Sequence, residues 1–116
     1  MPSKQSIKMS QTRIEQLLAF LEEEPNEPFN IYALALEYTK AEPSKAIGYF
    51  EQLLHKHPNY VATYYHAGKL YEELEMEEKA EEAYKKGVEI ATEQNEALAL
   101  RELKNAYQEF LDFKDM

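Results

Sequence analysis

Residues 61–92 read VATYYHAGKLYEELEMEEKAEEAYKKGVEIAT and repeat the pattern of residues 28–58, which read PFNIYALALEYTKAEPSKAIGYFEQLLHKHP. The first halves of the two copies match at an offset of 33 residues: Ile31, Leu34, Ala35 and Tyr38 correspond to Tyr64, Ala67, Gly68 and Tyr71. The second halves match at an offset of 34 residues: Ala46, Phe50, Leu53 and Leu54 correspond to Ala80, Tyr84, Gly87 and Val88. A unit followed by a near-copy of itself at this period is typical of a stacked array of helix pairs.

Within each half copy the apolar residues recur at the spacing of a helix. The four matched residues from Ile31 to Tyr38 stand at i, i+3, i+4 and i+7, so they share one helical face. Gly and Pro are scarce, at 3 and 5 residues, and no segment alternates apolar and polar residues as a strand does. The sequence therefore predicts an all-α protein of about six helices joined by short turns, with Ser44 and Asn95 as N-caps of the third and sixth helices.

The segments that flank the two copies have the same periodicity. Before the first copy, apolar residues from Ile14 to Leu21 share one helical face, and Pro25 ends that helix. After the second copy, apolar residues from Leu103 to Leu111 are spaced in the same way, whereas the first residues of the chain are polar and show no pattern. These patterns predict a flexible tail at residues 1–10, a helix at residues 12–25, a last helix at residues 95–113 and a single domain at residues 11–116.

This arrangement resembles the tetratricopeptide repeat (TPR) family. The motif of that family has a large apolar, a small and an aromatic residue along the first helix, then Ala, an aromatic residue, a small residue and Pro along the second. The second copy fills these places except the last, where Thr92 stands instead of a residue like Pro58. The resemblance implies an α-α superhelix of antiparallel helix hairpins: a half-repeat helix at residues 12–25, repeat one at 28–58, repeat two at 61–92 and a C-terminal capping helix at 95–113.

The glycines of the second copy predict close contacts between helices. A glycine inside a helix costs about 0.5–1 kcal/mol relative to alanine, so Gly68 and Gly87 indicate places where a neighbouring helix approaches closely. The aromatic residues of the pattern, among them Phe50 and Tyr84, are expected to fill the space between hairpins, because each buries a large apolar area.

Charge and composition exclude several classes of function. The chain of 116 residues has 13 basic and 22 acidic residues, and its net charge of −9 repels phosphate backbones and anionic lipids. We therefore expect no nucleic-acid ligand and no membrane surface as a partner. The chain has no Cys, no apolar N-terminal signal and no apolar run of about 20 residues, so we expect a cytoplasmic protein without disulfides or a membrane span.

No group of residues has the pattern of a catalytic or metal site. His55 and His57 end a helix and are interpreted as partners of its dipole, which leaves His66 without enough further ligands for a metal. The acidic run at residues 72–82 lacks the Asp/Asn-Gly loop of a calcium site and is interpreted as a solvated face. Phosphate loops, nucleophile elbows and zinc-protease helices are absent from the sequence. We therefore expect no enzyme, no metal and no cofactor.

The TPR resemblance places the candidate site on the first helix of each pair. As a family, TPR arrays line a concave groove with these helices. Several residues at the groove positions here are aromatic or apolar, and rigid aromatic side chains give contact area at a low entropy cost. The candidate partner-binding residues are Phe29, Tyr32, Leu36, Lys40, Tyr65, His66, Lys69 and Glu73.

One ligand class of the family does not fit. Some TPR proteins clamp the C-terminal carboxylate of chaperone tails with Lys, Asn and Arg in this groove. The corresponding places here hold Tyr32 and Leu36 in repeat one, and Ala62 and His66 in repeat two, so the clamp is absent.

Two functions fit this pattern. The first is an adaptor or scaffold that binds a peptide segment of a partner protein, anchored on Tyr32, Leu36 and Tyr65, with Lys69 or His66 meeting an acidic group. The second is a self-associating structural protein, because two full repeats fall below the usual minimum of three for a stable array. The groove or the last helix would then form a homodimer interface, or the last helix would itself cover the groove. A polar outer face of the last helix indicates a monomer, whereas exposed leucines there indicate self-association.

Overall fold

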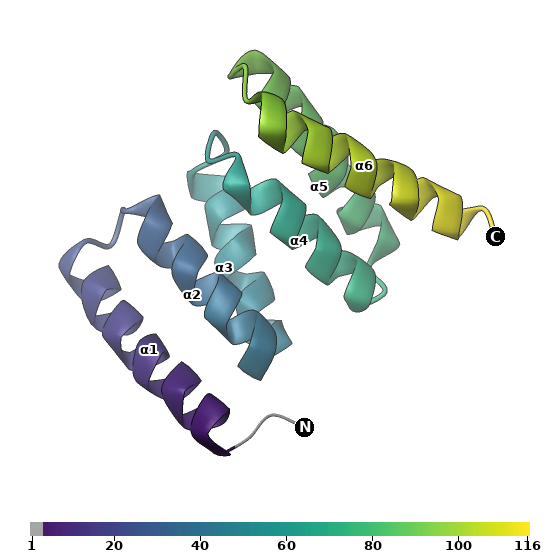
Figure 1. The fold of residues 1–116 in the computed structure, drawn as a ribbon. Coiled ribbons are helices and arrows are strands. Elements are labelled where there is room, and N and C mark those ends of the chain that lie inside the picture. The colour runs from purple at the N-terminus through teal and green to yellow at the C-terminus, as the bar shows by residue number, and fades with distance from the viewer. Residues whose placement is uncertain (1–3) are drawn as a thin grey trace. The chain divides into compact units, whose positions relative to one another are not determined.

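The structure, a computed structural model, describes residues 4–116, with side chains from residue 12 onward. Over these residues the chain is entirely helical, with six helices and no strand, as the sequence predicts (Figure 1). It divides into two compact units, Met1–His57 and Pro58–Met116, and each is described by itself. The helices are α1 (Lys4–Glu23), α2 (Pro28–Ala41), α3 (Pro43–Lys56), α4 (Ala62–Glu73), α5 (Glu77–Glu93) and α6 (Ala97–Lys114).

The first unit consists of α1, α2 and α3, with α1 packed against α2 and α2 packed against α3 (Figure 1). Pro28 begins α2, where its missing N–H costs nothing, and the Glu27 carboxylate accepts a hydrogen bond from the Phe29 amide at 3.3 Å. The buried apolar side chains of this unit are those that the helical spacing selects: Ile14, Leu17, Ile31, Ala33, Leu34, Ala35, Tyr38, Ala46, Phe50 and Leu53.

The first helix begins earlier than the sequence predicts. A helix was expected at residues 12–25 behind a tail at residues 1–10, whereas α1 covers Lys4–Glu23. No Gly or Pro stands between residues 4 and 23, so nothing in the covalent chain interrupts a helix there. Residues 1–3 of the expected tail lie outside the described residues.

The start of α3 corrects a predicted N-cap. The N-cap position is held by Glu42, and Pro43 is the first helical residue, so Ser44 lies inside the first turn. The physical reason is that proline has its φ angle fixed near the helical value and lacks the N–H that the first turn would leave unpaired.

The second corrected N-cap is Asn95, which ends α5 instead of beginning α6. Asn95 has a φ angle of 58°, and the Glu96 amide donates to the Ala91 carbonyl at 2.9 Å, which closes a Schellman turn. Asparagine tolerates this left-handed conformation better than most residues. Glu96 takes the N-cap position of α6, and α4 ends in the same kind of turn at Glu75, where φ is 59°.

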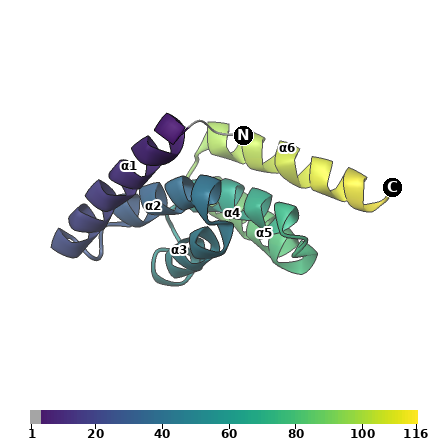
Figure 2. The same ribbon diagram turned by 90° about the horizontal axis from the view of Figure 1, so that it is seen from below.

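The second unit consists of α4, α5 and α6; α5 packs against both other helices, and α4 also contacts α6 (Figure 2). A Cβ built on Gly87 of α5 would lie 2.6 Å from Cβ of Tyr64 and 2.9 Å from Cδ2 of Leu103, closer than the 3.0 Å that real Cβ atoms keep. A Cβ built on Gly68 would clash in the same way with the ring of Tyr84. The close contacts predicted at both glycines are confirmed.

The two second helices of the repeats differ in length. α3 has 14 residues and α5 has 17. Pro58 follows the end of α3 at Lys56, whereas Thr92 stands at the corresponding place in the second copy and allows α5 to continue to Glu93. The missing proline therefore adds nearly one turn to the second repeat.

This extra turn shifts the position of α6 relative to the repeat. The buried residues of α6 have the spacing of the pattern residues in α4, at an offset of 39 residues: Leu103, Ala106 and Phe110 correspond to Tyr64, Ala67 and Tyr71. At the same offset Tyr107 corresponds to Gly68. The last helix thus repeats the buried face of α4 but has a large side chain where α4 has none.

Candidate protein-binding site

Four of the eight candidate residues share one side of α2, spaced three or four positions apart, and are called here the α2 strip: Phe29, Tyr32, Leu36 and Lys40. Phe29 is 55% exposed and Lys40 is exposed, while Tyr32 and Leu36 are half-buried. α1 packs against α2, and Arg13 of α1 pairs with Glu37 of α2 at 3.2 Å, between Nε and Oε1. The α2 strip therefore presents aromatic and apolar side chains to solvent, with one lysine near the end of the helix.

The other four candidates lie on α4, and three of them form a connected group, called here the α4 cluster: Tyr65, His66 and Lys69. The rings of Tyr65 and His66 pack edge to face with centroids 5.3 Å apart, and Nζ of Lys69 lies 5.8 Å from the centroid of the Tyr65 ring. Glu109 of α6 borders the cluster, with Oε2 at 3.8 Å from Nζ of Lys69. The fourth candidate, Glu73, is exposed in the last turn of α4.

The charge of the α4 cluster is set largely by α6. Burial lowers the pKa of the His66 imidazole, and the nearby carboxylate of Glu102 opposes this with a smaller effect. His66 is therefore neutral at pH 7, which leaves Lys69 as the single cation of the cluster. Lys69 is 38% exposed and already faces Glu109, so an acidic group of a partner would compete with a carboxylate of the chain itself.

Comparison with known proteins identifies the family. No protein-family model and no curated protein matches the chain. A TPR domain protein from Salinibacter ruber, solved in solution by NMR, is 42% identical with a TM-score of 0.71, over 75% of this chain and 89% of that one. The chain belongs to the tetratricopeptide repeat family. A crystal structure of a TPR domain protein from the same organism is also 42% identical, with a TM-score of 0.70, over 72% of this chain and 96% of that one.

A more distant structure shows the same fold over almost the whole chain. The TPR domain of Sgt2 from Aspergillus fumigatus is 19% identical and has a TM-score of 0.74, over 97% of this chain and 75% of that one. The resemblance drawn from the repeat at residues 28–58 and 61–92 is thus confirmed. The TPR fold is that of a protein–protein interaction module, and this defines the class of function at the level of the fold.

The remaining chemical groups of the TPR chain form structural contacts. Among the residues with described side chains, no three His, Asp or Glu residues are placed to hold a metal ion. Two members of the acidic run at residues 72–82 have partners: Glu72 accepts a hydrogen bond from the Tyr84 hydroxyl, and Glu81 pairs with Lys85 at 3.6 Å. Of the helices within residues 4–116, none has the length and hydrophobicity of a membrane span.

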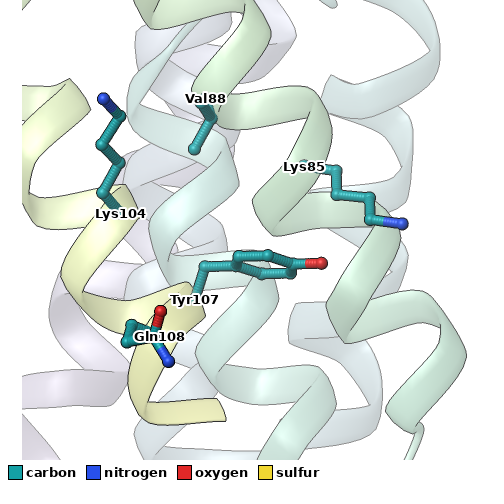
Figure 3. Close-up of a pocket in the computed structure, with 5 residues that line it drawn as sticks. All are labelled: Lys85, Val88, Lys104, Tyr107 and Gln108. Atoms are coloured by element: carbon teal, nitrogen blue, oxygen red, sulfur yellow. The ribbon is translucent and has the colours of Figure 1, made fainter. Parts of the chain in front are cut away.

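Sequence reasoning missed one feature of the TPR chain, a cleft between α5 and α6. Its volume is about 350 Å³, and it is lined by Lys85, Val88, Lys104, Tyr107 and Gln108 (Figure 3). The repeat motif does not mark these positions, since three of the five are polar side chains on helix surfaces. The one available signal was Tyr107, an aromatic residue at the place where α4 has Gly68.

Proposed function

We propose that this TPR protein is an adaptor that binds a segment of another protein through the α2 strip and the α4 cluster. The observation that carries the proposal is the exposure of Phe29, an aromatic side chain at the start of α2, next to the half-buried Tyr32 and Leu36. Large apolar groups grouped on one exposed helix face favour contact with a partner. The family supports a protein as the ligand.

The charges around these surfaces favour a partner segment with apolar anchors and neighbouring basic residues. Glu73, Glu102 and Glu109 lie on α4 and α6 and are all exposed, and two of them are near side chains of the α4 cluster. A basic residue of the partner gains from these carboxylates, mainly in association rate and specificity. The rings of Tyr65 and His66 offer an apolar contact beside them.

Further parts of the proposal follow from the composition. A net charge of −9 disfavours nucleic acid and anionic membranes as ligands, so the proposed partner is a protein or peptide. The absence of Cys is consistent with a reducing cytoplasm as the proposed location. Residues 11–116 are proposed to act as one domain, with no catalytic residue and no cofactor.

Peptide selection followed by matched substitutions tests the proposal. Peptides are selected from a displayed random library on the wild-type chain, and the enriched peptide is measured by fluorescence anisotropy. Phe29→Ala, and separately Leu36→Ala combined with Tyr65→Ala, should each weaken binding by about tenfold or more, as expected when an interface anchor is truncated.

Leu98→Ala is the matched control for Phe29→Ala. Leu98 is 59% exposed on α6 and belongs to neither proposed surface, so its loss should leave the affinity unchanged. Circular dichroism checks that each variant keeps its helix content. Equal affinity of all variants for the selected peptide would show that the site lies elsewhere on the chain.

Self-association is the alternative function, and α6 separates the two. The polar residues expected on its outer face are all exposed: Glu102, Lys104, Asn105, Gln108 and Glu109. This favours a monomer with free surfaces, although Leu98 is exposed and Leu100 is half-buried. Light scattering across a range of concentrations decides: a stable dimer that Leu98→Ala dissociates would place the structural function first.

A further inference from the structure

The cleft between α5 and α6 has a charge opposite to that of the chain. Its lining comes from Lys85 and Val88 on α5 and from Lys104, Tyr107 and Gln108 on α6 (Figure 3). Two of these five residues are lysines and none is acidic, in a chain with a net charge of −9. The cleft is therefore a place where an anionic group is attracted locally to an otherwise acidic protein.

The floor of the cleft is apolar and held in place by packing. The ring of Tyr107 extends from α6 towards α5, below Val88 in the view of Figure 3. It packs against Tyr84 with centroids 6.2 Å apart and against Phe110 with centroids 6.4 Å apart. A ring fixed by two others forms a contact surface that loses little freedom when a ligand binds.

The polar atoms around this floor are mainly hydrogen-bond donors. Each lysine carries three N–H donors and no acceptor, and the amide of Gln108 carries two. Lys85 lies 3.6 Å from Glu81 on the same helix, an exposed pair worth less than about 1 kcal/mol that a ligand can replace. One N–H of Gln108 donates to Asp112 at 2.9 Å, which leaves its second N–H for a ligand. These donors match carboxylate oxygens.

The position of Tyr107 shows that the cleft is not shaped for a helix. In α4 the corresponding residue is Gly68, and the following helix uses that space for the ring of Tyr84. In α6 the side chain of Tyr107 fills this space itself, so a helix cannot nest there in the way α5 nests on α4. A volume of about 350 Å³ accommodates one or two side chains of a short segment.

We propose that this cleft binds a short acidic segment of another protein, in which one aliphatic or aromatic side chain has carboxylates on both sides. The apolar side chain rests on Val88 and Tyr107, and the carboxylates meet Lys85 and Lys104. The site is separate from the α2 strip and the α4 cluster, whose surroundings favour basic partners. The chain would thus carry two surfaces that select segments of opposite charge.

NMR with the full-length 15N-labelled chain tests this proposal. The probe is a short synthetic peptide with one leucine between pairs of glutamates, and the matched probe has glutamines in place of the glutamates. The acidic probe should shift the amide signals of the lining residues of α5 and α6, and the glutamine probe should not. Lys85→Gln combined with Lys104→Gln should weaken binding by about fivefold, the loss of two exposed ion pairs.

A control variant removes the same charge elsewhere. Lys56→Gln combined with Lys86→Gln changes two lysines outside the cleft lining and should leave the shifts unchanged. The proposal is overturned if the control and test variants weaken binding equally, if the glutamine probe binds equally well, or if the acidic probe shifts only signals of α2 and α4. It is also overturned if the cleft signals shift with protein concentration alone, because a second copy, whose exposed Leu74 lies between Glu73 and Glu75, would then be the occupant.

Discussion

The ring of Tyr84 occupies the space in which a side chain on Gly68 would lie. A Cβ on Gly68 would come within 2.7 Å of Cζ of that ring, and the hydroxyl at the end of the ring donates a hydrogen bond to Glu72. Gly68 and Glu72 are one helical turn apart on α4, so a single residue of α5 contacts both. Tyr84 therefore fixes both the distance between the two helices and their alignment along the axis.

Alanine at Gly68 should destabilise the protein, whereas alanine at Gly48 should stabilise it. Gly48 lies in α3 with nothing within 4 Å of a Cβ, so the substitution gains about 0.5–1 kcal/mol of helix propensity. At Gly68 the same gain is outweighed by overpacking against Tyr84, which costs about 1–3 kcal/mol. Urea denaturation of the two variants measures both signs. A stabilised Gly68→Ala variant would mean that Tyr84 moves aside at little cost.

Glycine at position 75 should raise the melting temperature. Glu75 ends α4 with φ at 59°, a conformation that costs a residue with a Cβ about 1 kcal/mol and glycine nothing. Glu75→Gly should therefore raise Tm by about 4 °C. Glu75→Gln is the control for the lost charge and should change Tm less, since it keeps the strained backbone. Asn95→Gly, at φ 58°, should gain less than Glu75→Gly because asparagine tolerates this conformation.

The repeat was readable from the sequence because the fold places strict demands on few positions. Gly68 and Gly87 stand where helices cross, and Ile31 and Phe50 stand in a core where any other size would leave a void or a clash. Such positions recur at a fixed period. The helix ends were less predictable, since Ser44 and Asn95 have the chemistry of an N-cap but neighbouring residues, a proline and a Schellman turn, decide where the helices begin.

The candidate site was predictable only in part. The spacing along α2 and α4 is sufficient to group Phe29 with Leu36 and Tyr65 with Lys69, because residues three and four apart share a helical face. It does not reveal that Glu109 lies near Lys69, since that contact depends on the register of α6. The extra turn of α5 shifts this register, and the only trace in the sequence is a threonine at position 92 where the first copy has a proline.

Removal of the Tyr84 hydroxyl should weaken the protein and change its response to alkali. Tyr84→Phe loses the hydrogen bond to Glu72, at a cost of about 1–2 kcal/mol near neutral pH. Burial, and secondarily the hydrogen bond to Glu72, raises the pKa of Tyr84 above its usual value of about 10. The folded state therefore favours the neutral phenol, and this stability is present below pH of about 10 and is lost as the pH rises further.

The alkaline loss should be smaller in Tyr84→Phe than in the wild-type protein. Burial also raises the pKa of Tyr49 and Tyr64, which both chains share, so the variant keeps part of the pH dependence. Urea denaturation at several values from pH 8 upward, in both chains, measures the difference. Parallel curves would show that the phenol of Tyr84 ionises as easily in the folded state as in the unfolded state.

The pKa of His66 should lie below the ordinary value for histidine and should fall further when Glu102 is neutralised. Burial favours the neutral ring, and the Glu102 carboxylate partly offsets this by attracting the proton, so Glu102→Gln removes the only opposing interaction among these two. Because the folded-state pKa is lowered, the unfolded chain takes up the proton first, and stability should decrease as the pH falls through about 6.5. An NMR titration of the imidazole signals in both chains measures the shift. A pKa that rises in Glu102→Gln would mean that Glu102 does not face His66, and the acidic border assigned to the α4 cluster would then lose one of its two carboxylates.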